Sequence, residues 1–361
     1  MTSKTLPRTL DGYAKAAEAM MSPANRAYFL GSAGRGMTAK SNERAFHQAT
    51  LLPRPLRDLR GGSTALTLLG QNLACPILVA PFAYHRLLDP QAEIATAKGA
   101  QAQSVKMILS AQSSTDLRQV RDAAPATDWF QLYWMGSRDG TLALAKRAIA
   151  AGYTTLVLTI DAPVQGVRDA EIEAAFQLPP EVSAVNLAGI AHPRFAPLAE
   201  GESMVFDRIA SIMSDWDDIA WLIGAVTLPV LIKGVLHPDD AARAQQIGAA
   251  GIIVSNHGGR VMDGVPATLD VLPAIINAVA DGIPVLMDGG IRRGADVLVA
   301  LAMGAKAVLV GRPAVCGLAV GGAIGVSHVL RLLRDELEIA MVLAGCRTLA
   351  DITPDLLYRN R

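Results

Sequence analysis

The chain has 361 residues, of which 51% are hydrophobic and 18% charged, and its 33 basic and 33 acidic side chains cancel. This balance argues against nucleic acid or an anionic membrane surface as the main partner. The three cysteines, Cys75, Cys316 and Cys346, are odd in number and far apart, so they form no disulfide framework and no metal motif, and we expect no metal site and a reducing, cytoplasmic location.

The first 70 residues precede the regular part of the chain, and we expect them to form two short helices and a small capping element. Asp11, Lys15, Glu18 and Arg26 interrupt the N-terminal stretch, which therefore lacks the continuous apolar segment of a signal peptide. No run in the sequence approaches the roughly 20 apolar residues of a membrane span. We therefore expect no membrane anchor.

Eight short apolar runs follow, and each is succeeded by a polar turn and a segment with helical periodicity. Continuous apolar runs are typical of parallel strands that are covered by helices. The runs are PILVA 76–80, KMILS 106–110, WFQLY 129–133, TTLVLTI 154–160, PVLIK 229–233, GIIVS 251–255, PVLMD 284–288 and KAVLV 306–310. Eight β/α units favour a (β/α)8 TIM barrel over an open doubly wound sheet with a miscounted strand. We expect a single domain, 1–361, with the barrel at about 71–350.

One connection is far longer than the others. It leads from the fourth strand, which ends near Ile160, to the fifth, which starts near Pro229. Its middle, residues 179–204, is rich in Pro, Ala and Gly and has weak periodicity, as is typical of a lid or of a disordered loop. We expect a lid over the barrel mouth, without an apolar run that could anchor the protein to a membrane.

Polar residues gather at the carboxyl ends of the eight strands, where barrels of this type carry their functional sites. A single Ser, Thr or Gln at a strand end is usually a hydrogen-bonded structural group, but that does not explain their concentration at one rim. The strand ends carry Ala80 to Ala83, Ser110, Gln131 and Tyr133, Thr159 and Asp161, Lys233, Ser255 to Arg260, Asp288 to Arg292, and Gly311 to Pro313.

The last two strands are followed by sequences that suit a phosphate group. DGGIRRG, residues 288–294, and GRP, residues 311–313, combine glycines with arginines. Glycine lets backbone N–H groups approach an anion, and arginine adds a charged fork. Because barrels commonly bind phosphate after their seventh and eighth strands, we predict a phosphate site here.

Lys233 ends an apolar strand, and a lysine in a barrel mouth must meet negative charge because burying it unpaired is costly. The N1–C2=O edge of a flavin, which gains negative charge on reduction, would suit it. The alternative is a structural pair with an aspartate at a strand end.

His257 lies just past the sixth strand, in SNHGGR 255–260. A lone histidine is more often structural than catalytic, but Arg260 follows it and Asp161 stands at the end of the fourth strand. An aspartate can fix the tautomer of a histidine and stabilise its protonated form. An arginine can hold a substrate carboxylate. Together these residues predict a base that acts on an anionic substrate.

These motifs make the chain similar to the FMN-dependent α-hydroxy-acid oxidase/dehydrogenase family, which includes glycolate oxidase, lactate oxidase and mandelate dehydrogenase. The resemblance runs from about residue 10 to about residue 350 and includes FQLYW, LTIDAP, LIKGV and AAGIIVSNHGGR. It implies FMN as cofactor and oxidation of an (S)-2-hydroxy acid to the 2-oxo acid. It further implies O2 or a quinone-like electron acceptor, and a homo-oligomer, either tetramer or octamer.

The resemblance also implies roles for individual residues. His257 would accept the substrate proton, Asp161 would orient His257, and Tyr133 would contact the substrate hydroxyl. The substrate carboxylate would be bound by Tyr28, Arg168 and Arg260. The flavin ring and ribityl chain would be held by the backbone of Ala83 and by Ser110, Gln131, Thr159, Lys233 and Ser255. The ribityl chain and phosphate would be held by Asp288, Gly290, Arg292, Gly311 and Arg312.

Four positions depart from members that resemble glycolate oxidase: Phe82 replaces Thr, Gln112 replaces Trp, Val167 replaces Arg and Val261 replaces Gln. None of these changes removes a catalytic group. APFAYH, residues 80–85, is more similar to the hydroxymandelate-oxidising branch, and Gln is smaller than Trp. We therefore predict a preference for mandelate-like or medium-chain 2-hydroxy acids over glycolate, unless Phe82 swings into the space that Gln112 leaves.

Two other hypotheses stay open at this point. An FMN-dependent isomerase of the isopentenyl diphosphate type would share the barrel and the phosphate site, but it would not need His257, Asp161 and the arginines. An inactive barrel that only binds a ligand would need none of them.

Overall fold

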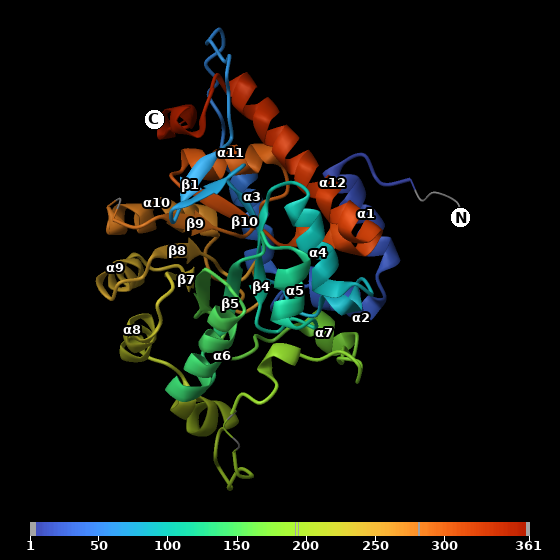
Figure 1. The fold of residues 1–361 in the computed structure, drawn as a ribbon, viewed down its shortest axis with the longest axis vertical. Coiled ribbons are helices and arrows are strands. Elements are labelled where there is room, and N and C mark those ends of the chain that lie inside the picture. Colours follow the sequence, from blue (N-terminus) through green and yellow to red (C-terminus); the bar gives the residue numbers. More distant parts are fainter. Residues whose placement is uncertain (1–4, 192, 194, 281, 359–361) are drawn as a thin grey trace.

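The computed structural model describes residues 5–191, 193, 195–280 and 282–358. Eight parallel strands close into a barrel in the order β10-β3-β4-β5-β6-β7-β8-β9 (Figure 1). They are β3 Ile77–Val79, β4 Lys106–Ser110, β5 Trp129–Tyr133, β6 Thr155–Thr159, β7 Val230–Val235, β8 Gly251–Val254, β9 Val285–Met287 and β10 Ala307–Val310. Seven of the predicted apolar runs contain one of these strands, and the run 229–233 overlaps β7, which continues to Val235; the predicted (β/α)8 barrel is therefore confirmed.

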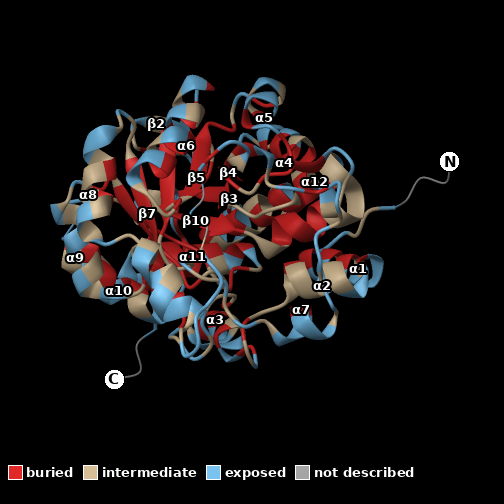
Figure 2. Ribbon diagram, turned by 90° about the horizontal axis from the view of Figure 1, so that it is seen from below, coloured by how far each residue is buried: buried red, intermediate tan, exposed pale blue. Residues whose placement is uncertain are grey.

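Helices surround the barrel, with buried inner faces and exposed outer faces (Figure 2). They are α4 Ala92–Gln101, α5 Leu117–Ala123, α6 Arg138–Ala150, α8 Trp216–Ala225, α9 Pro238–Gln246, α10 Thr268–Val279, α11 Gly294–Ala302 and α12 Arg312–Ala344. Alternate strand residues therefore meet two different apolar environments. Leu78 and Ile108 belong to a cluster inside the barrel, whereas Val79 and Met107 pack toward the helices. This double burial explains why the strand sequences are apolar throughout.

From residue 5 onward, the N-terminal region contains three helices rather than the two that we expected: α1 Leu10–Met20, α2 Pro23–Leu30 and α3 Met37–Gln48. The missed helix is α3, whose sequence MTAKSNERAFHQ is mostly polar and whose buried face includes Thr38 and Asn42. A search for apolar periodicity does not find such a face. The expected capping element is an antiparallel hairpin of β1 Leu66–Leu68 and β2 Gln71–Leu73.

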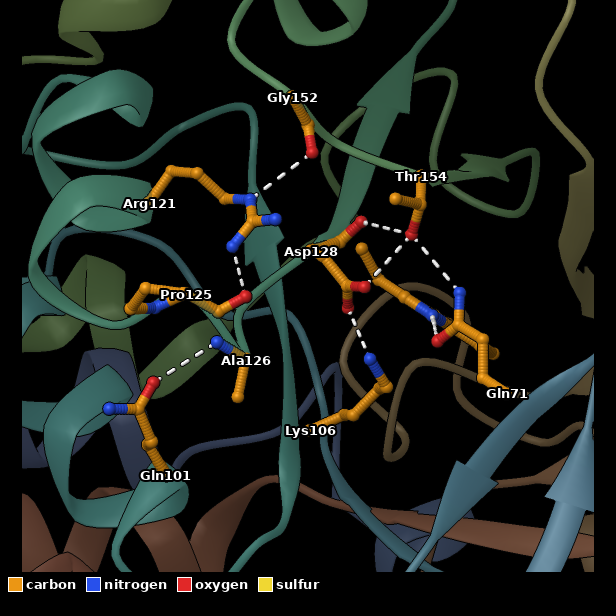
Figure 3. Close-up of polar contacts among 10 residues, drawn as sticks. Gln71, Gln101, Lys106, Arg121, Pro125, Ala126, Asp128, Gly152 and Thr154 are labelled. Carbon is orange, nitrogen blue, oxygen red and sulfur yellow. Dashed lines mark hydrogen bonds and ion pairs between the residues drawn. The ribbon is translucent and has the colours of Figure 1, made fainter.

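The hairpin closes the N-terminal end of the barrel, opposite the predicted site. Leucines of the hairpin pack on the apolar cluster inside the barrel. The Gln71 side chain accepts a hydrogen bond from Trp129 Nε1 (3.2 Å) and donates one to Thr154 Oγ1 (3.1 Å). Thr154 Oγ1 donates to Asp128 Oδ2 (3.0 Å), and Asp128 Oδ1 lies 2.6 Å from Lys106 Nζ (Figure 3). A polar network therefore seals the end of the barrel that faces away from the site.

Helix α12 modifies one expectation. Its length and hydropathy alone would allow it to cross a membrane, although we expected no such run. However, Gly321 and Gly322 have non-helical backbone angles that break it into two helices. Half of its most apolar window is buried, and it packs against α1, α4 and α11. These contacts are those of a helix in the outer layer of the barrel.

The long connection between β6 and β7 is partly helical. It contains α7 Asp169–Glu173, a short 3-10 turn at Val185–Leu187, a π-helical turn at Met204–Ile209 and a 3-10 turn at Ala210–Ile212. Its part that follows α7 runs below the barrel in Figure 1.

Candidate active site

A cavity of about 710 Å³ opens at the carboxyl ends of the strands, within the size range of small-molecule sites. Most of the predicted site residues line it: Tyr28, Ala83, Ser110, Tyr133, Arg168, Lys233, His257, Arg260, Asp288, Gly290, Arg292, Gly311 and Arg312. The remaining four do not line the cavity but contact or neighbour residues that do: Gln131, Thr159, Asp161 and Ser255. Ser110 Oγ donates to Gln131 Oε1, Lys233 donates to Ser255, and Asp161 contacts His257. Thr159 pairs with Lys233 in the register of β6 and β7.

The His257 ring is fixed from two directions. Its backbone has a φ of +57°, in the left-handed region that non-glycine residues rarely adopt, and its N–H donates to Ser255 Oγ (3.0 Å). Its Nδ1 lies 3.0 Å from Asp161 Oδ1. Because the carboxylate accepts the proton of Nδ1, Nε2 is left as the free acceptor of the neutral ring.

The Asp161 carboxylate stays ionised beside His257. Burial raises the pKa of Asp161, but His257 and Lys233 lower it by more, so the net pKa lies below its usual value. A permanent negative charge next to Nδ1 holds the ring in the tautomer whose Nε2 is free to accept a proton. The pair can therefore take up a proton from a molecule in the cavity.

Two arginines stand close together across from His257. Arg168 Nε donates to the carbonyl of Arg260 (3.0 Å), and Arg260 lies over the ring of Tyr28, 5.5 Å from its centroid. Burial and the neighbouring Arg168 lower the pKa of Arg260 to about 10. Two largely buried arginines that are linked in this way form a strong site for a carboxylate.

Glu171 joins these arginines, and sequence reasoning missed it. Its Oε1 lies 3.0 Å from Arg168 Nη1 and 3.3 Å from Arg260 Nη2. In the sequence it belongs to DAEIE, which has the pattern of a solvated helical turn. Yet its side chain is only 8% exposed.

Lys233 is almost completely buried, with its Nζ 2.7 Å from Ser255 Oγ and 3.1 Å from Asp288 Oδ2. Burial lowers the pKa of Lys233, but Asp288 and Asp161 raise it by more, so the net pKa lies above its usual value. The structural pair with a strand-end aspartate thus exists. It leaves room for a ligand, because an ammonium group has three donors and Lys233 also lines the cavity.

Several buried polar atoms around the cavity have no hydrogen-bond partner among the described residues. They include Gln131 Nε2, Thr159 Oγ1, Asp288 Oδ1 and Arg312 Nε. Leaving such an atom unpaired costs roughly 1–3 kcal/mol. All four residues belong to the set predicted to hold a flavin nucleotide, and a ligand with a polar ring edge, a polyol chain and a phosphate offers them partners. The residues present therefore fit FMN.

The predicted phosphate end carries excess positive charge. Burial, together with Arg292 and Arg260, lowers the pKa of Arg312 to about 9. Arg312 donates to the carbonyls of Gly258 (3.1 Å) and Gly31 (2.9 Å), and α12 begins at this arginine. A helix N-terminus with adjacent arginines attracts an anion. This arrangement supports the predicted phosphate site.

Helix α3 supports both glycine-rich loops of the site. A Cβ atom on Gly259 would lie 2.6 Å from the amide nitrogen of Ala39, and one on Gly290 would lie 2.4 Å from the carbonyl of Asn42. Asn42 also exchanges two side-chain hydrogen bonds with Asn256, of 2.9 and 2.8 Å. Only glycine permits this approach. Sequence reasoning missed Asn42, because 214 positions separate it from its partner.

The lid prediction is wrong in its boundaries. None of the described residues of 179–204 lines the cavity; the part of the long connection that does so lies upstream, between Ala162 and Leu178. Phe176, from this upstream part, stacks on Tyr28 of α2 with a centroid distance of 4.5 Å. The downstream part packs on the outer helices instead: Arg147 of α6 donates to the carbonyl of Ala188.

Phe82 and Gln112 both line the cavity, as predicted for residues that shape the pocket. The Phe82 ring stacks on His85 with a centroid distance of 3.6 Å and an interplanar angle of 14°. His85 is fully buried, and its ring contacts Thr96 Oγ1 (2.9 Å) and the Phe82 carbonyl (3.0 Å). The stack therefore holds the Phe82 ring in place. A movement of this ring toward Gln112 would break the stack.

Comparisons with known proteins point to one family. The family model for FMN-dependent dehydrogenases matches residues 17–359. An L-lactate oxidase from Roseobacter sp. (strain GAI101) is 48% identical over 98% of this chain and 95% of its own length. Glycolate oxidase 3 from Oryza sativa subsp. indica is 41% identical over 90% of this chain and 89% of its own length. A crystal structure of mandelate oxidase with benzoyl-formic acid superposes with a TM-score of 0.88 at 36% identity, and 97% of each chain is covered.

The fold and the site thus define a flavin-dependent barrel oxidoreductase. More specifically, the chain belongs to the FMN-dependent dehydrogenase family, and its cofactor is FMN. The family expected from the motifs is confirmed. The roles of the individual site residues stay predictions.

Proposed function

We propose that this chain oxidises an (S)-2-hydroxy acid to the corresponding 2-oxo acid and uses O2 as the electron acceptor. The observation that carries the proposal is one cavity that joins the His257–Asp161 pair, the Arg168–Arg260 pair and the flavin-site Lys233. Relatives named L-lactate oxidase and glycolate oxidase support the same chemistry. Bound FMN supplies the acceptor for the two electrons that leave the substrate.

The side chains of the site bind the substrate and accept its proton. Arg168 and Arg260 bind the carboxylate and so fix the α-carbon near His257. Tyr133 contacts the substrate hydroxyl; burial and Asp161 raise its pKa, so it stays a neutral phenol. His257 accepts a proton from the substrate at Nε2, and Asp161 stabilises the imidazolium that results.

The relatives suggest which substrate side chains to test first. Relatives at 44–48% identity are named L-lactate oxidases, whereas solved structures at 35–36% identity are of mandelate oxidase. We propose L-lactate as the first substrate to test. Mandelate is the second, since Gln112 and the fixed Phe82 favour a pocket with room for a bulky group.

An anaerobic screen tests the proposal. Purified holoenzyme is mixed with glycolate, L-lactate, 2-hydroxyoctanoate or mandelate, and the flavin absorbance is followed before air is admitted. We expect bleaching by at least one acid and, on admission of air, return of the colour with formation of hydrogen peroxide. A yellow protein that no acid bleaches would favour the isomerase hypothesis, and a protein that does not take up FMN would favour the inactive barrel.

Two further expectations belong to the proposal. We propose a tetramer or octamer, which analytical ultracentrifugation of the holoenzyme would test. We also propose a cytoplasmic location. It is supported by three cysteines that are all buried and free in the described part of the chain, as suits a reducing compartment.

A further inference from the structure

Glu171 occupies an unexpected place for an acidic residue. Its carboxylate lines the cavity that we propose for an anionic substrate, and its side chain is only 8% exposed. Burying a carboxylate is costly unless it is paired. Here one oxygen, Oε1, contacts both Arg168 Nη1 (3.0 Å) and Arg260 Nη2 (3.3 Å). A single carboxylate thus bridges the two cations that bind the substrate.

The bridge leaves each arginine with donors to spare. Arg168 uses Nε for the Arg260 carbonyl and Nη1 for Glu171. Arg260 uses Nη1 for the Gly31 carbonyl and Nη2 for Glu171. Arg168 Nη2 and Arg260 Nε make no hydrogen bond within the described part of the chain. A substrate carboxylate can use these donors while Glu171 stays in place.

The bridge also changes the charge of the site. Arg168 and Arg260 would otherwise present two positive charges that repel each other at close range. Glu171 cancels one of them. A ligand with one negative charge then makes the site neutral, whereas a ligand with two leaves a buried excess of negative charge.

We propose that Glu171 is a positioning residue that holds Arg168 and Arg260 side by side and reduces their joint charge to one, so that the site selects monoanionic over dianionic 2-hydroxy acids. This inference rests on the proposed function, because it assigns the arginines to the substrate carboxylate. Glu171 itself is held by other residues of the connection between β6 and β7: Gln165 Nε2 donates to its Oε2 (3.4 Å), and its carbonyl accepts from the amide of Phe176 (2.9 Å).

Oxalate and oxamate test the charge directly, because they have nearly the same shape and differ by one negative charge at neutral pH. Their dissociation constants are measured by titration calorimetry on the holoenzyme. We expect Glu171→Gln to shift the ratio of the two constants toward oxalate by about tenfold or more, because a negative charge beside the arginines is lost. Glu171→Asp keeps the charge and should keep the native ratio, even if both ligands bind more weakly.

Glu173→Gln is the matched control. Glu173 lies on the same helix, α7, but is exposed and lines no part of the cavity. This substitution removes the same charge two positions away and should leave the ratio unchanged. An equal shift in this variant would mean that the effect is a general field of the surface, and the proposal would be wrong.

Three other results would overturn the proposal. An unchanged ratio in Glu171→Gln would show that Glu171 does not set the charge of the site. Tighter binding of both ligands in parallel would show that Glu171 competes with the substrate instead of positioning the arginines. A Glu171→Asp variant that behaves like Glu171→Gln would assign the effect to packing.

The native protein provides a further test if Glu171→Gln does not retain FMN. With one net positive charge, the native holoenzyme should bind oxamate more tightly than oxalate, and tighter binding of oxalate would contradict the proposal. The titration is also independent of turnover. If no 2-hydroxy acid bleaches the flavin, the proposed function fails, whereas the oxalate-to-oxamate ratio still reports on Glu171.

Discussion

At the scale of single residues, His257 shows how the chain aims one side chain. A non-glycine residue in the left-handed region costs on the order of 1–3 kcal/mol, and His257 has a φ of +57°. The contacts of its amide with Ser255 and of its ring with Asp161 offset this cost. Residues with a strained backbone cluster at active sites, which agrees with the role that we predict for His257.

The first prediction removes this base. General-base catalysis is typically worth about 10²–10⁴-fold, and the weak acidity of an α-carbon proton places this case toward the upper end. We expect His257→Gln to keep FMN and its yellow colour but to reduce the flavin with substrate at least ~10³-fold more slowly. Anaerobic stopped flow measures the rate, and near-normal reduction would rule out His257 as the base.

The second prediction concerns Arg260. Arg260→Lys keeps a positive charge but loses the planar fork, so it cannot contact Glu171, the Gly31 carbonyl and a substrate carboxylate together. Because the carboxylate positions the α-carbon, both substrate affinity and the rate of flavin reduction should fall. Rapid-mixing kinetics over a range of substrate concentrations separate the two. Unchanged kinetics would assign Arg260 a structural role.

The sequence alone predicted the site residues that lie at the carboxyl ends of the strands. His257 and Arg260 come soon after an apolar run and Lys233 ends one, so the barrel rule places all three at one rim. Glu171 and Asn42 could not be found in this way. Glu171 acts through a pair with Arg260, 89 positions away, and Asn42 acts through Asn256. Nothing local in the sequence distinguishes either residue from a solvated polar group.

At the scale of elements, the eight strands could be predicted from the sequence. Helix α3 and the cavity-lining segment 162–178 could not. Parallel strands buried on two sides have continuous apolar sequences. Helix α3 is recognised only by the close approach of its backbone to Gly259 and Gly290. Composition drew attention to residues 179–204, but the residues that reach the cavity, such as Phe176, lie in a segment with ordinary composition.

The third prediction concerns the pocket wall that follows β4. Gln112 and Phe82 both line the cavity, and the stack on His85 opposes movement of the Phe82 ring toward Gln112. A phenyl group bound there in place of hydrogen would favour binding by on the order of 2 kcal/mol before entropic costs. We therefore expect mandelate or 2-hydroxyoctanoate to have a higher kcat/KM than glycolate. Steady-state assays compare these acids with L-lactate, and a clear preference for glycolate would contradict a large pocket.

Gln112→Trp provides the matching variant. The larger side chain should fill the wall and shift preference toward the small acids, glycolate and L-lactate. If the native pocket is already small, the substitution should change the preference little. Retention of FMN, followed by its absorbance, separates a change of pocket from a loss of the cofactor site.

At the scale of the whole molecule, the residues of the site and a network that stabilises the fold lie at opposite ends of the barrel. Its carboxyl-terminal end carries the cavity, and its N-terminal end is closed by the β1–β2 hairpin and by a network of Gln71, Lys106, Asp128 and Thr154 (Figure 3). The apolar cluster inside the barrel lies between the two ends. A substitution at the closed end should therefore change the stability of the protein without reaching the substrate.

The last prediction tests this separation with Asp128→Asn. The substitution keeps the shape of the side chain but removes the charge that pairs with Lys106, whose side chain is only 14% exposed. Leaving a largely buried ammonium group unpaired costs several kcal/mol when burial is complete, and the remaining exposure reduces this to about 1–3 kcal/mol. We expect the thermal midpoint of the holoenzyme to fall by about 1–4 °C while kcat/KM for the best 2-hydroxy acid stays at its native value. Asp122→Asn is the control, because Asp122 is an exposed residue of α5 and has no ion pair in the described part of the chain; it should leave both quantities unchanged. A loss of kcat/KM in Asp128→Asn without a fall in the thermal midpoint would show that the two ends of the barrel are coupled through its apolar interior.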